Sequence, residues 1–394
     1  MEATVIDLQR VGGEAELLAY DVGGIVEKAY FITTAPVRGF ERIVKGKNPV
    51  FAVNAVMRIC GICHAAHGIA SAEAIEDAMG VSPPANGRYL RETIGLLNKI
   101  QSHLMHLVMI IPDLVQEPER MKYIVATLNI LNKINDVLSK LGGSPTHPPY
   151  IVIGGVSRVP DEKTLAKLLE ELDKLIEEYI GLRRSFETSI SSSDVYEQLR
   201  AKKLRPKYLA SHMFYGDKYS IRIDKIRVVR YEDIHEDLPS RARENTSMIA
   251  LYDDQVVEAG PRARLNKYYD YSEDSLWGLQ EARLIEIELF LKRTRELLEK
   301  VEVGEPGYSK VLVYRSGKGT GVFEAPRGTL IHKVELDDNG RISKYKIIVP
   351  TMFNIPLIEQ AAQGFPSKHV DVVPRIYDPC IPCSTHITRL EKGR

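Results

Sequence analysis

The sequence has few cysteines and no excess of charge of either sign. Four cysteines and one tryptophan occur among 394 residues, and 53 basic residues balance 53 acidic ones, so the formal net charge is zero. So few cysteines in so long a chain exclude a small secreted domain held together by disulfides. A neutral chain also lacks the basic footprint of proteins that bind nucleic acid or anionic membranes. We therefore expect no nucleic-acid partner.

Long apolar runs and a leader are also missing. The longest uncharged apolar run, Leu104–Ile111, is far shorter than the roughly 18–20 residues that a bilayer span requires. The start of the chain, Met1–Thr4, does not begin the basic and then apolar pattern of a secretory signal. We expect a soluble, cytoplasmic protein without direct membrane insertion. A chain can still be exported with a partner that carries the signal, so this expectation concerns the chain alone.

The remaining composition is that of a globular protein, with 44% hydrophobic and 27% charged residues, which excludes a collagen-like or disordered chain. Near both ends, short apolar runs bounded by turn residues predict strands. The predicted strands are Thr4–Leu8, Glu14–Tyr20 and a run to Phe31 after a turn at Asp21–Gly24, then Val311–Tyr314, Thr329–Leu336 and Arg341–Val349, the last two joined at Asn339–Gly340.

Between these ends, apolar residues recur every three or four positions, which is the spacing of one helix face. Long helices are predicted over Arg88–Ile111, Met121–Lys140, Glu162–Arg183 and Ser275–Lys300, and Pro112 is expected to end or kink the first. The charged, irregular stretch from 190 to 270 is predicted to be a surface excursion. We predict a single α+β domain over residues 1–394, mainly α, with a long-helix bundle as its core and small β elements at both ends.

All four cysteines lie in two pairs with the CxxC spacing, Cys60–Cys63 and Cys380–Cys383, near opposite ends of the chain. A structural zinc site usually has its pairs about 15–20 residues apart, although sites with distant pairs exist. A redox dithiol needs only one pair, next to a βαβ unit. The third interpretation is a buried site for a soft metal such as nickel, iron, copper(I) or zinc, closed by both ends of the chain.

The residues around the two pairs form longer motifs. Arg58-Ile-Cys60-Gly-Ile-Cys63-His-Ala-Ala-His67 reads RxCGxCxxxH, and Asp378-Pro-Cys380-Ile-Pro-Cys383-Ser-Thr-His386 reads DPCxxCxxH. Both resemble the paired motifs of the nickel–iron hydrogenase large subunit. The resemblance continues through Arg38–Glu41, Glu324–Gly328 and Val349–Asn354, and is greatest to cytoplasmic members of the sulfhydrogenase or deazaflavin-coenzyme-reducing type.

This resemblance implies a nickel–iron centre that cleaves dihydrogen reversibly and heterolytically. Cys60 and Cys380 would be terminal nickel ligands, and Cys63 and Cys383 would bridge nickel to an iron that carries carbon monoxide and cyanide. Sharing two sulfurs lets four cysteines hold two metals and leaves a position open for dihydrogen. Cys380 would be the first proton acceptor, because an arginine is a poor base at neutral pH.

The resemblance also assigns polar residues around the centre. Arg327, next to Pro326 in the cofactor-binding set, would act as an electrostatic clamp oriented by Asp378. Asp113 would complete the same polar canopy, unless it is only a helix-terminal residue bonded to solvent or backbone. His67 would hydrogen-bond a bridging sulfur. A second site for magnesium or iron would use Glu41, the carbonyl of Ile355 and His386.

Two departures from the family pattern affect the prediction. The family motif RxEGH reads Arg10-Val11-Gly12-Gly13-Glu14 here, so Gly12 replaces the glutamate that relays the proton. Glu14 would lie on the same strand face as Gly12 and could substitute through water; otherwise the chain is a slow or inactive relative. Family members are commonly cleaved after the last motif histidine, so residues 387–394 are expected to be removed by a maturation protease.

No cysteine remains for an iron–sulfur cluster. The resemblance therefore implies an iron–sulfur small subunit as partner, and a diaphorase or deazaflavin-linked subunit that chooses the electron acceptor. Two rival hypotheses stay open: a non-catalytic relative within an electron-transfer complex, and a zinc-stapled structural subunit. Two other patterns are expected to be structural: Ser316–Gly321 as a loop near the metal site, and His103 with His106 as residues of the core or of a subunit interface.

Overall fold

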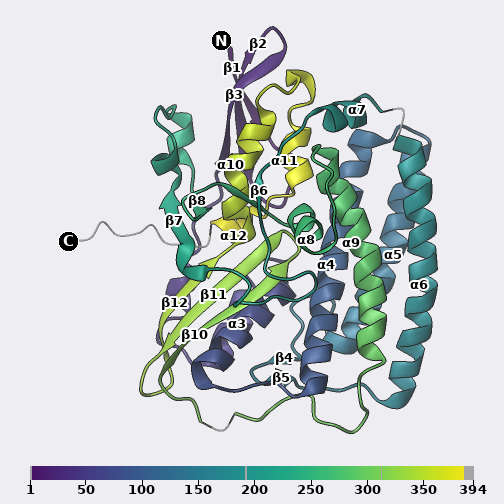
Figure 1. Ribbon diagram of the computed structural model, residues 1–394, viewed down its shortest axis with the longest axis vertical. Coiled ribbons are helices and arrows are strands. Elements are labelled where there is room, and N and C mark those ends of the chain that lie inside the picture. Colours follow the sequence, from purple (N-terminus) through teal and green to yellow (C-terminus); the bar gives the residue numbers. More distant parts are fainter. Residues whose placement is uncertain (1, 191–192, 312, 386–394) are drawn as a thin grey trace.

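The computed structural model describes residues 2–190, 193–311 and 313–385. Figure 1 shows long helices that stand side by side and, next to them, a diagonal sheet near the bottom of the view with a helix behind it. A second sheet, which contains the N-terminal strands, projects at the top of the view. The long helices are α4 (Ala85–Leu114), α5 (Glu119–Gly142), α6 (Glu162–Ser189) and α9 (Trp277–Leu298). The predicted α+β architecture with a helical bundle is confirmed.

The bundle is arranged around α4, which packs against α5 and α9, while α6 packs against the same two helices. Helix α6 begins at the expected residue, where the Asp161 side chain accepts a hydrogen bond from the Thr164 amide at 2.7 Å. It ends at Ser189, beyond the expected Arg183. Pro112 lies inside the last turn of α4. Of the described helices, only α4 is long and apolar enough to cross a membrane by length and composition, and 83% of its most apolar window is buried in the protein.

The N-terminal sheet agrees with the sequence prediction. Strands β1 (Glu2–Asp7), β2 (Ala15–Val22) and β3 (Ile25–Thr33) form an antiparallel sheet in that order. Gly23 and Gly24, both with positive φ, make the turn between β2 and β3. The sheet is covered on one side by α10 (Pro350–Ala362), which contacts β3.

The C-terminal sheet contains a strand that the sequence did not predict. It consists of β10 (Gly317–Ala325), β11 (Gly328–Leu336) and β12 (Ile342–Ile348), all antiparallel, and it packs on α3 (His64–Met79). The expectation of a loop over Ser316–Gly321 is therefore wrong. Added Cβ atoms on the alternate glycines of β10 would lie 2.0–2.1 Å from carbonyl oxygens of α3. These glycines let strand and helix backbones touch.

Two further expectations are corrected. Residues 311, 313 and 314 have no regular structure, and Val313 is 76% exposed, so its β-branched side chain has no buried face to favour a strand. The stretch 190–270 is only partly a surface excursion, because β8 (Met248–Tyr252) and much of α8 (Pro261–Tyr268) are buried. Its charged residues include arginines that are paired inside the protein, which composition alone does not reveal.

The remaining elements are short and connect the larger ones. They are α1 (Phe40–Ile43), α2 (Pro49–Met57), β4 (Ile151–Val152), β5 (Gly155–Val156), α7 (Asp194–Ala201), β6 (Lys207–Leu209), β7 (Ile226–Arg230), β9 (Val257–Ala259), α11 (Val372–Tyr377), α12 (Ile381–Ser384) and the 3₁₀ turns Ile223–Lys225, Tyr231–Ile234, Arg241–Glu244 and Ser367–His369.

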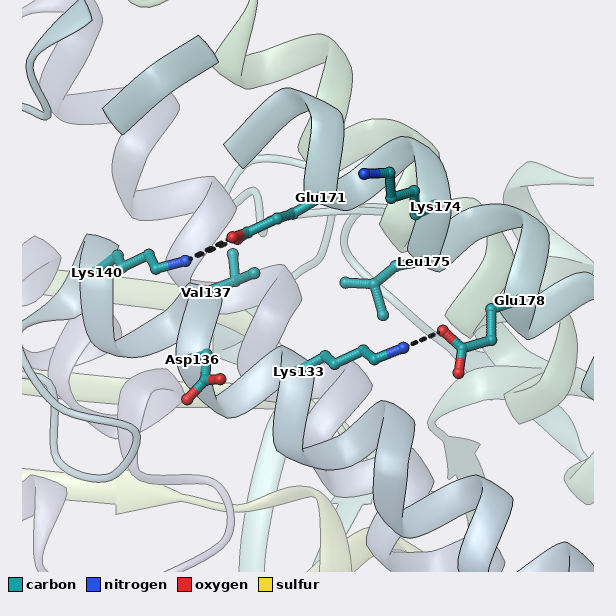
Figure 2. A pocket seen from close by; sticks show the side chains of 8 residues that line it. All are labelled: Lys133, Asp136, Val137, Lys140, Glu171, Lys174, Leu175 and Glu178. Atoms are coloured by element: carbon teal, nitrogen blue, oxygen red, sulfur yellow. Dashed lines mark hydrogen bonds and ion pairs between the residues drawn. The ribbon is translucent and has the colours of Figure 1, made fainter. Parts of the chain in front are cut away.

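A groove between α5 and α6 lies on the surface of the bundle. Figure 2 shows its rim, where Lys140 pairs with Glu171 and Lys133 with Glu178, and the apolar side chain of Leu175 lies between the two pairs. Such partly exposed ion pairs contribute little to stability, about 0–1 kcal/mol each. None of the predicted site residues lines this groove, so the chemistry has to be sought elsewhere.

Candidate metal centre

The four thiols from the two ends of the chain meet in the interior. Their sulfur atoms all lie within 4.8 Å of one another, and all four cysteines are buried. The Sγ–Sγ distances are 3.3 Å for Cys60 and Cys380, 3.2 Å for Cys63 and Cys383, and 2.9 Å for Cys380 and Cys383. A disulfide would measure about 2.05 Å. The arrangement is that of ligands gathered around a common centre.

Local backbone structure places each pair at the start of a helix. Cys63 is the N-cap residue of α3, and Cys380 is that of the short helix α12, which contains Cys383. The amides of Ile62 and Cys63 donate to the sulfur of Cys60 at 3.2 and 3.3 Å. Amide donors and the positive end of a helix both favour a thiolate over a thiol.

Contacts between the ends of the chain hold the two pairs together. The Arg38 guanidinium donates to the carbonyls of Ile59 and Pro382, at 2.5 Å each, and so bridges the residues that precede Cys60 and Cys383. The N-terminal segment adds a backbone hydrogen bond of 2.9 Å from Ile381 to Gly12. Arg38 belongs to the motif noted in the sequence, but its role as this bridge was not predicted.

The thiols cannot all be ionised without nearby positive charge. Hydrogen bonds from the other three cysteines lower the pKa of Cys60, whereas burial raises that of Cys383. Like charges at these distances repel strongly in a dry site. A bound soft metal would remove this repulsion, and a set of four thiolates suits nickel, iron or zinc. The donor set therefore fits a metal centre of the kind that the motifs imply.

Arg327 and Asp378 form a buried ion pair beside the thiols. Arg327 lines the same small cavity as Cys63, Cys380 and Cys383. Its Nη2 donates to Asp378 Oδ1 at 2.8 Å and its Nε donates to the Asp378 carbonyl at 2.6 Å. Burial alone would lower the pKa of Arg327, but Asp378 and the cysteines raise it overall, so the guanidinium stays charged.

Asp378 orients Arg327 as expected, and one of its atoms is left over. Oδ2 of Asp378 is buried and has no hydrogen-bond partner among the described residues. The third partner of Arg327 is Ser102 Oγ on α4, at 3.2 Å, which the sequence analysis did not identify. A buried acceptor normally has a hydrogen-bond partner, so this oxygen needs a donor that the described residues do not supply.

His67 makes the predicted contact with a sulfur, and a longer chain of polar groups lies behind it. Its Nε2 lies 3.4 Å from Cys383 Sγ, and its Nδ1 lies 3.1 Å from Nε2 of His332. His332 in turn meets the Tyr345 hydroxyl at 2.8 Å, and this hydroxyl meets Ser71 at 2.7 Å. His332 was missed, although a histidine on the apolar face of a period-two strand pattern is a readable signal.

The expectation that Asp113 completes this canopy is not met. Its carboxylate pairs with Arg375 at 3.0 and 3.2 Å, and with Arg10 at 2.6 Å. This carboxylate joins the end of α4 to α11 and to the N-terminal segment. The helix-terminal position was read correctly, but the sequence could not show which arginine faces it.

The expectation for Glu14 is also corrected. Residues 12–14 are not a regular strand: Gly13 has a φ of 123°, and Glu14 is exposed, so side-chain alternation does not apply. Gly12 itself is paired with Cys380 in an isolated bridge, and an added Cβ on Gly12 would lie 3.9 Å from the Cα of Cys380. The glycine thus stands next to a predicted metal ligand.

The second predicted metal site is only partly described. Burial raises the pKa of Glu41 to about 7, and one carboxylate oxygen accepts from the Ile347 amide at 2.8 Å. Ile355 is fully buried in α10. His386, and residues 387–394 with the expected cleavage point, lie outside the described residues.

The remaining predicted residues make hydrogen bonds that stabilise the interior of the protein. Pro326 is buried in the turn before Arg327, and its carbonyl accepts from Arg264 at 3.1 Å. His103 bonds Glu286 at 2.9 Å and His106 bonds the Arg375 carbonyl at 2.8 Å. The two histidines thus face different partners, and of the two predicted alternatives, the core or a subunit interface, the structure places them in the core.

Residues 38–111 and 272–386 match the family described as nickel-dependent hydrogenase. The chain is 36% identical to the coenzyme F420 hydrogenase subunit alpha of Methanocaldococcus jannaschii, over 95% of this chain and 91% of that protein. It is 28% identical to the sulfhydrogenase 2 subunit alpha of Pyrococcus furiosus, over 96% of this chain and 97% of that protein.

A solved structure supports the fold. The Ni-Fe-Se hydrogenase from D. vulgaris Hildenborough in its as-isolated oxidized state superimposes with a TM-score of 0.84, at 22% identity, covering 98% of this chain and 100% of that chain. At this identity the match concerns the fold alone. The arrangement of the helical bundle and the sheets is thus a known architecture.

Proposed function

The chain belongs to the nickel-dependent hydrogenase family, as a large, catalytic subunit, and we propose that it cleaves dihydrogen heterolytically and reversibly with a small-subunit partner. The observation that supports this most is the meeting of four buried thiols from both ends of the chain beside Arg327. A bound nickel–iron pair, with carbon monoxide and cyanide on the iron, would supply the Lewis-acid and redox chemistry.

The protein's own residues hold this centre and move the proton. Cys60 and Cys380 would serve as terminal ligands of the bound centre, and Cys63 with Cys383 would serve as shared ligands. As a thiolate, Cys380 would accept the first proton, because its sulfur lines the same cavity as Arg327 and an arginine is a poor base at neutral pH. His67 holds the shared sulfur of Cys383 in place and tunes its basicity.

Arg327 acts electrostatically rather than as a base. Its guanidinium remains charged beside the thiols, held by two hydrogen bonds to Asp378. A fixed positive charge in a dry site stabilises negative charge that develops when dihydrogen is split. The cavity is small, and beside the thiols, Arg327, His67 and Thr351 its lining is apolar, formed by Ala325, Leu330, Val349 and Pro350.

Electrons leave through other chains. Each of the four cysteines belongs to the thiol cluster, so we propose an iron–sulfur small subunit, and a diaphorase or deazaflavin-linked subunit beyond it. The match to the F420 hydrogenase subunit alpha supports the second partner. We further propose a cytoplasmic location, magnesium or iron at a second site with Glu41, Ile355 and His386, and removal of residues 387–394 by a maturation protease.

The test of this function is spectroscopic. The complex purified under anaerobic conditions is expected to contain nickel and iron, and to show infrared bands of metal-bound carbon monoxide and cyanide. Isotope exchange between D2 and water should occur without an electron acceptor, because heterolysis alone produces it. Zinc in the thiol site, without those bands, would contradict the proposal and favour the structural subunit instead.

A catalytically impaired relative is the second candidate, and Gly12 is the observation that favours it. A Gly12→Glu variant is expected to speed D2–water exchange about tenfold or more, since a positioned acid–base group contributes roughly 10²–10⁴-fold. The nearest atom to an added Cβ is the Pro379 carbonyl oxygen at 3.3 Å, so a small adjustment suffices. Gly12→Gln, equal in shape but unable to carry the proton, is the control. Equal rates in both variants would show that another group already relays the proton.

A further inference from the structure

Arg327 stands at the tip of a tight hairpin. Ala325 and Gly328 form the last pair between β10 and β11, so Pro326 and Arg327 alone turn the chain. The whole tip is buried. Buried carbonyls in such a turn need hydrogen-bond donors, and Pro326 brings no N–H of its own. Whatever supplies those donors decides where the tip, and with it Arg327, can lie.

Arg264 on α8 supplies them. Its Nη1 donates to the Ala325 carbonyl at 2.9 Å and its Nη2 to the Pro326 carbonyl at 3.1 Å. The other donors reach Glu286, at 2.6 and 2.7 Å, and Glu324, at 3.2 Å. A guanidinium has five N–H groups in one plane, and this one uses all five. Its orientation is therefore fixed by four different residues.

The anchor behind Arg264 is itself rigid. Burial would raise the pKa of Glu286, but Arg264 and His103 outweigh it and lower that pKa to about 2. Glu324 accepts from the amide and hydroxyl of Ser211, at 2.8 and 2.9 Å, and from the Thr329 hydroxyl at 2.7 Å. Arg264, Glu286 and Glu324 are fully buried. In such a buried and closely packed network of charges, the side chains have little freedom to move, so Arg264 is held in one position.

A second buried arginine on the same helix shows that this arrangement is specific. Arg262 is also fully buried; it pairs with Glu258 and donates to the Ser275 carbonyl at 2.7 Å. Its hydrogen bonds join α8 to β9 and to the segment before α9. Arg264, in contrast, donates two of its five hydrogen bonds to the backbone carbonyls of Ala325 and Pro326, next to Arg327. The two arginines thus share burial and pairing and differ in what they hold.

We propose that Arg264 is a positioning residue: by holding the carbonyls of Ala325 and Pro326 it aims the guanidinium of Arg327 at the thiol cluster. The consequence for turnover rests on the proposed hydrogenase function, whereas the consequence for the hairpin tip does not. Lysine at position 264 keeps the positive charge but has no planar fork, so it cannot hold both carbonyls and Glu286 together.

The structural part is tested on the full-length chain without metals. Amide hydrogen exchange, followed by mass spectrometry over residues 322–332, is expected to be about tenfold faster in Arg264→Lys than in the wild type. Arg262→Lys, the matched control, should leave this segment protected. Unchanged exchange in Arg264→Lys, or equal acceleration in both variants, would overturn the proposal.

The functional part is tested by a double-mutant cycle on the loaded complex. Arg264→Lys is expected to lower the D2–water exchange rate about tenfold, because small misplacements of a charged group cost that much or more. In an Arg327→Lys background it should lower the rate no further, since Arg264 acts through Arg327. If the losses in rate from the two substitutions multiplied in the double variant, Arg264 would act independently of Arg327, which would contradict the proposal.

Two provisions keep the outcomes separable. If Arg264→Lys does not fold, Glu286→Gln replaces it, because this variant keeps the side-chain shape and weakens the ion pair that holds Arg264. We then expect the same faster amide exchange at the hairpin tip and the same non-additivity with Arg327→Lys. If the wild-type complex has no isotope exchange with D2, the proposed function fails. The amide-exchange comparison of Arg264→Lys with Arg262→Lys then still decides whether Arg264 holds the tip.

Discussion

A Cys383→Ala variant is expected to contain neither nickel nor iron and to have no measurable D2–water exchange. Cys383 lies 3.2 Å from Cys63 and 2.9 Å from Cys380, so its sulfur belongs to both halves of the cluster. Removing a shared ligand takes a donor from two metals at once, and an alanine methyl group offers no replacement. Elemental analysis of the purified protein, beside infrared spectra, measures the loss.

The control for this prediction is Ser384→Ala in the same short helix. The Ser384 hydroxyl bonds the Ser247 hydroxyl at 2.8 Å and is buried like its neighbour, but it is not a thiol. This variant is expected to lose stability by about 1 kcal/mol and to keep its metals. A Cys383→Ala protein that retains nickel and iron at wild-type levels would remove Cys383 from the ligand set.

An Arg327→Lys variant is expected to keep both metals and to lose turnover by a factor on the order of 10²–10³, as for removal of one preorganised electrostatic donor. The lysine retains the charge but cannot make the two-point contact with the carboxylate and carbonyl of Asp378. Metal content should persist because the four thiols are untouched. D2–water exchange rates, normalised to nickel, give the effect on the chemical step.

Ser102→Ala is the matched control for the arginine. It removes the longest of the three contacts of Arg327, the 3.2 Å bond to Ser102 Oγ, and leaves the pair with Asp378 intact. Its rate is expected to stay within about tenfold of the wild type. Wild-type turnover in Arg327→Lys would show that the guanidinium is structural and that the electrostatic clamp does not exist.

The sequence predicted much of the architecture because its signals are local. The four long helices were found from apolar spacing. The strand β10 was missed because its alternating glycines resemble a loop; they are there because the backbone of α3 comes within contact distance. The close approach of two backbones is a feature of the tertiary structure, and the glycines alone do not show which segment they contact.

For the candidate site, too, some residues could be predicted from the sequence and others could not. The motifs pointed to the four cysteines, His67, Arg327 and Asp378, and the structure brings all of them to one place. Asp113 was assigned from the resemblance and Glu14 from side-chain alternation along a strand, and both expectations failed. Their surroundings are set by Arg375 and by the bend at Gly13, which come from other parts of the fold.

By itself, then, the sequence determined which atoms are available: four sulfurs in two spaced pairs, charged residues beside them, and helices long enough to form a core. Only the tertiary structure decided which charges face one another. Arg264 meets the hairpin tip, Arg38 joins the two cysteine pairs, and Arg375 takes Asp113. The reason is physical: apolar spacing is written along the chain, whereas a buried ion pair depends on partners from distant segments that only the completed fold brings within hydrogen-bonding distance.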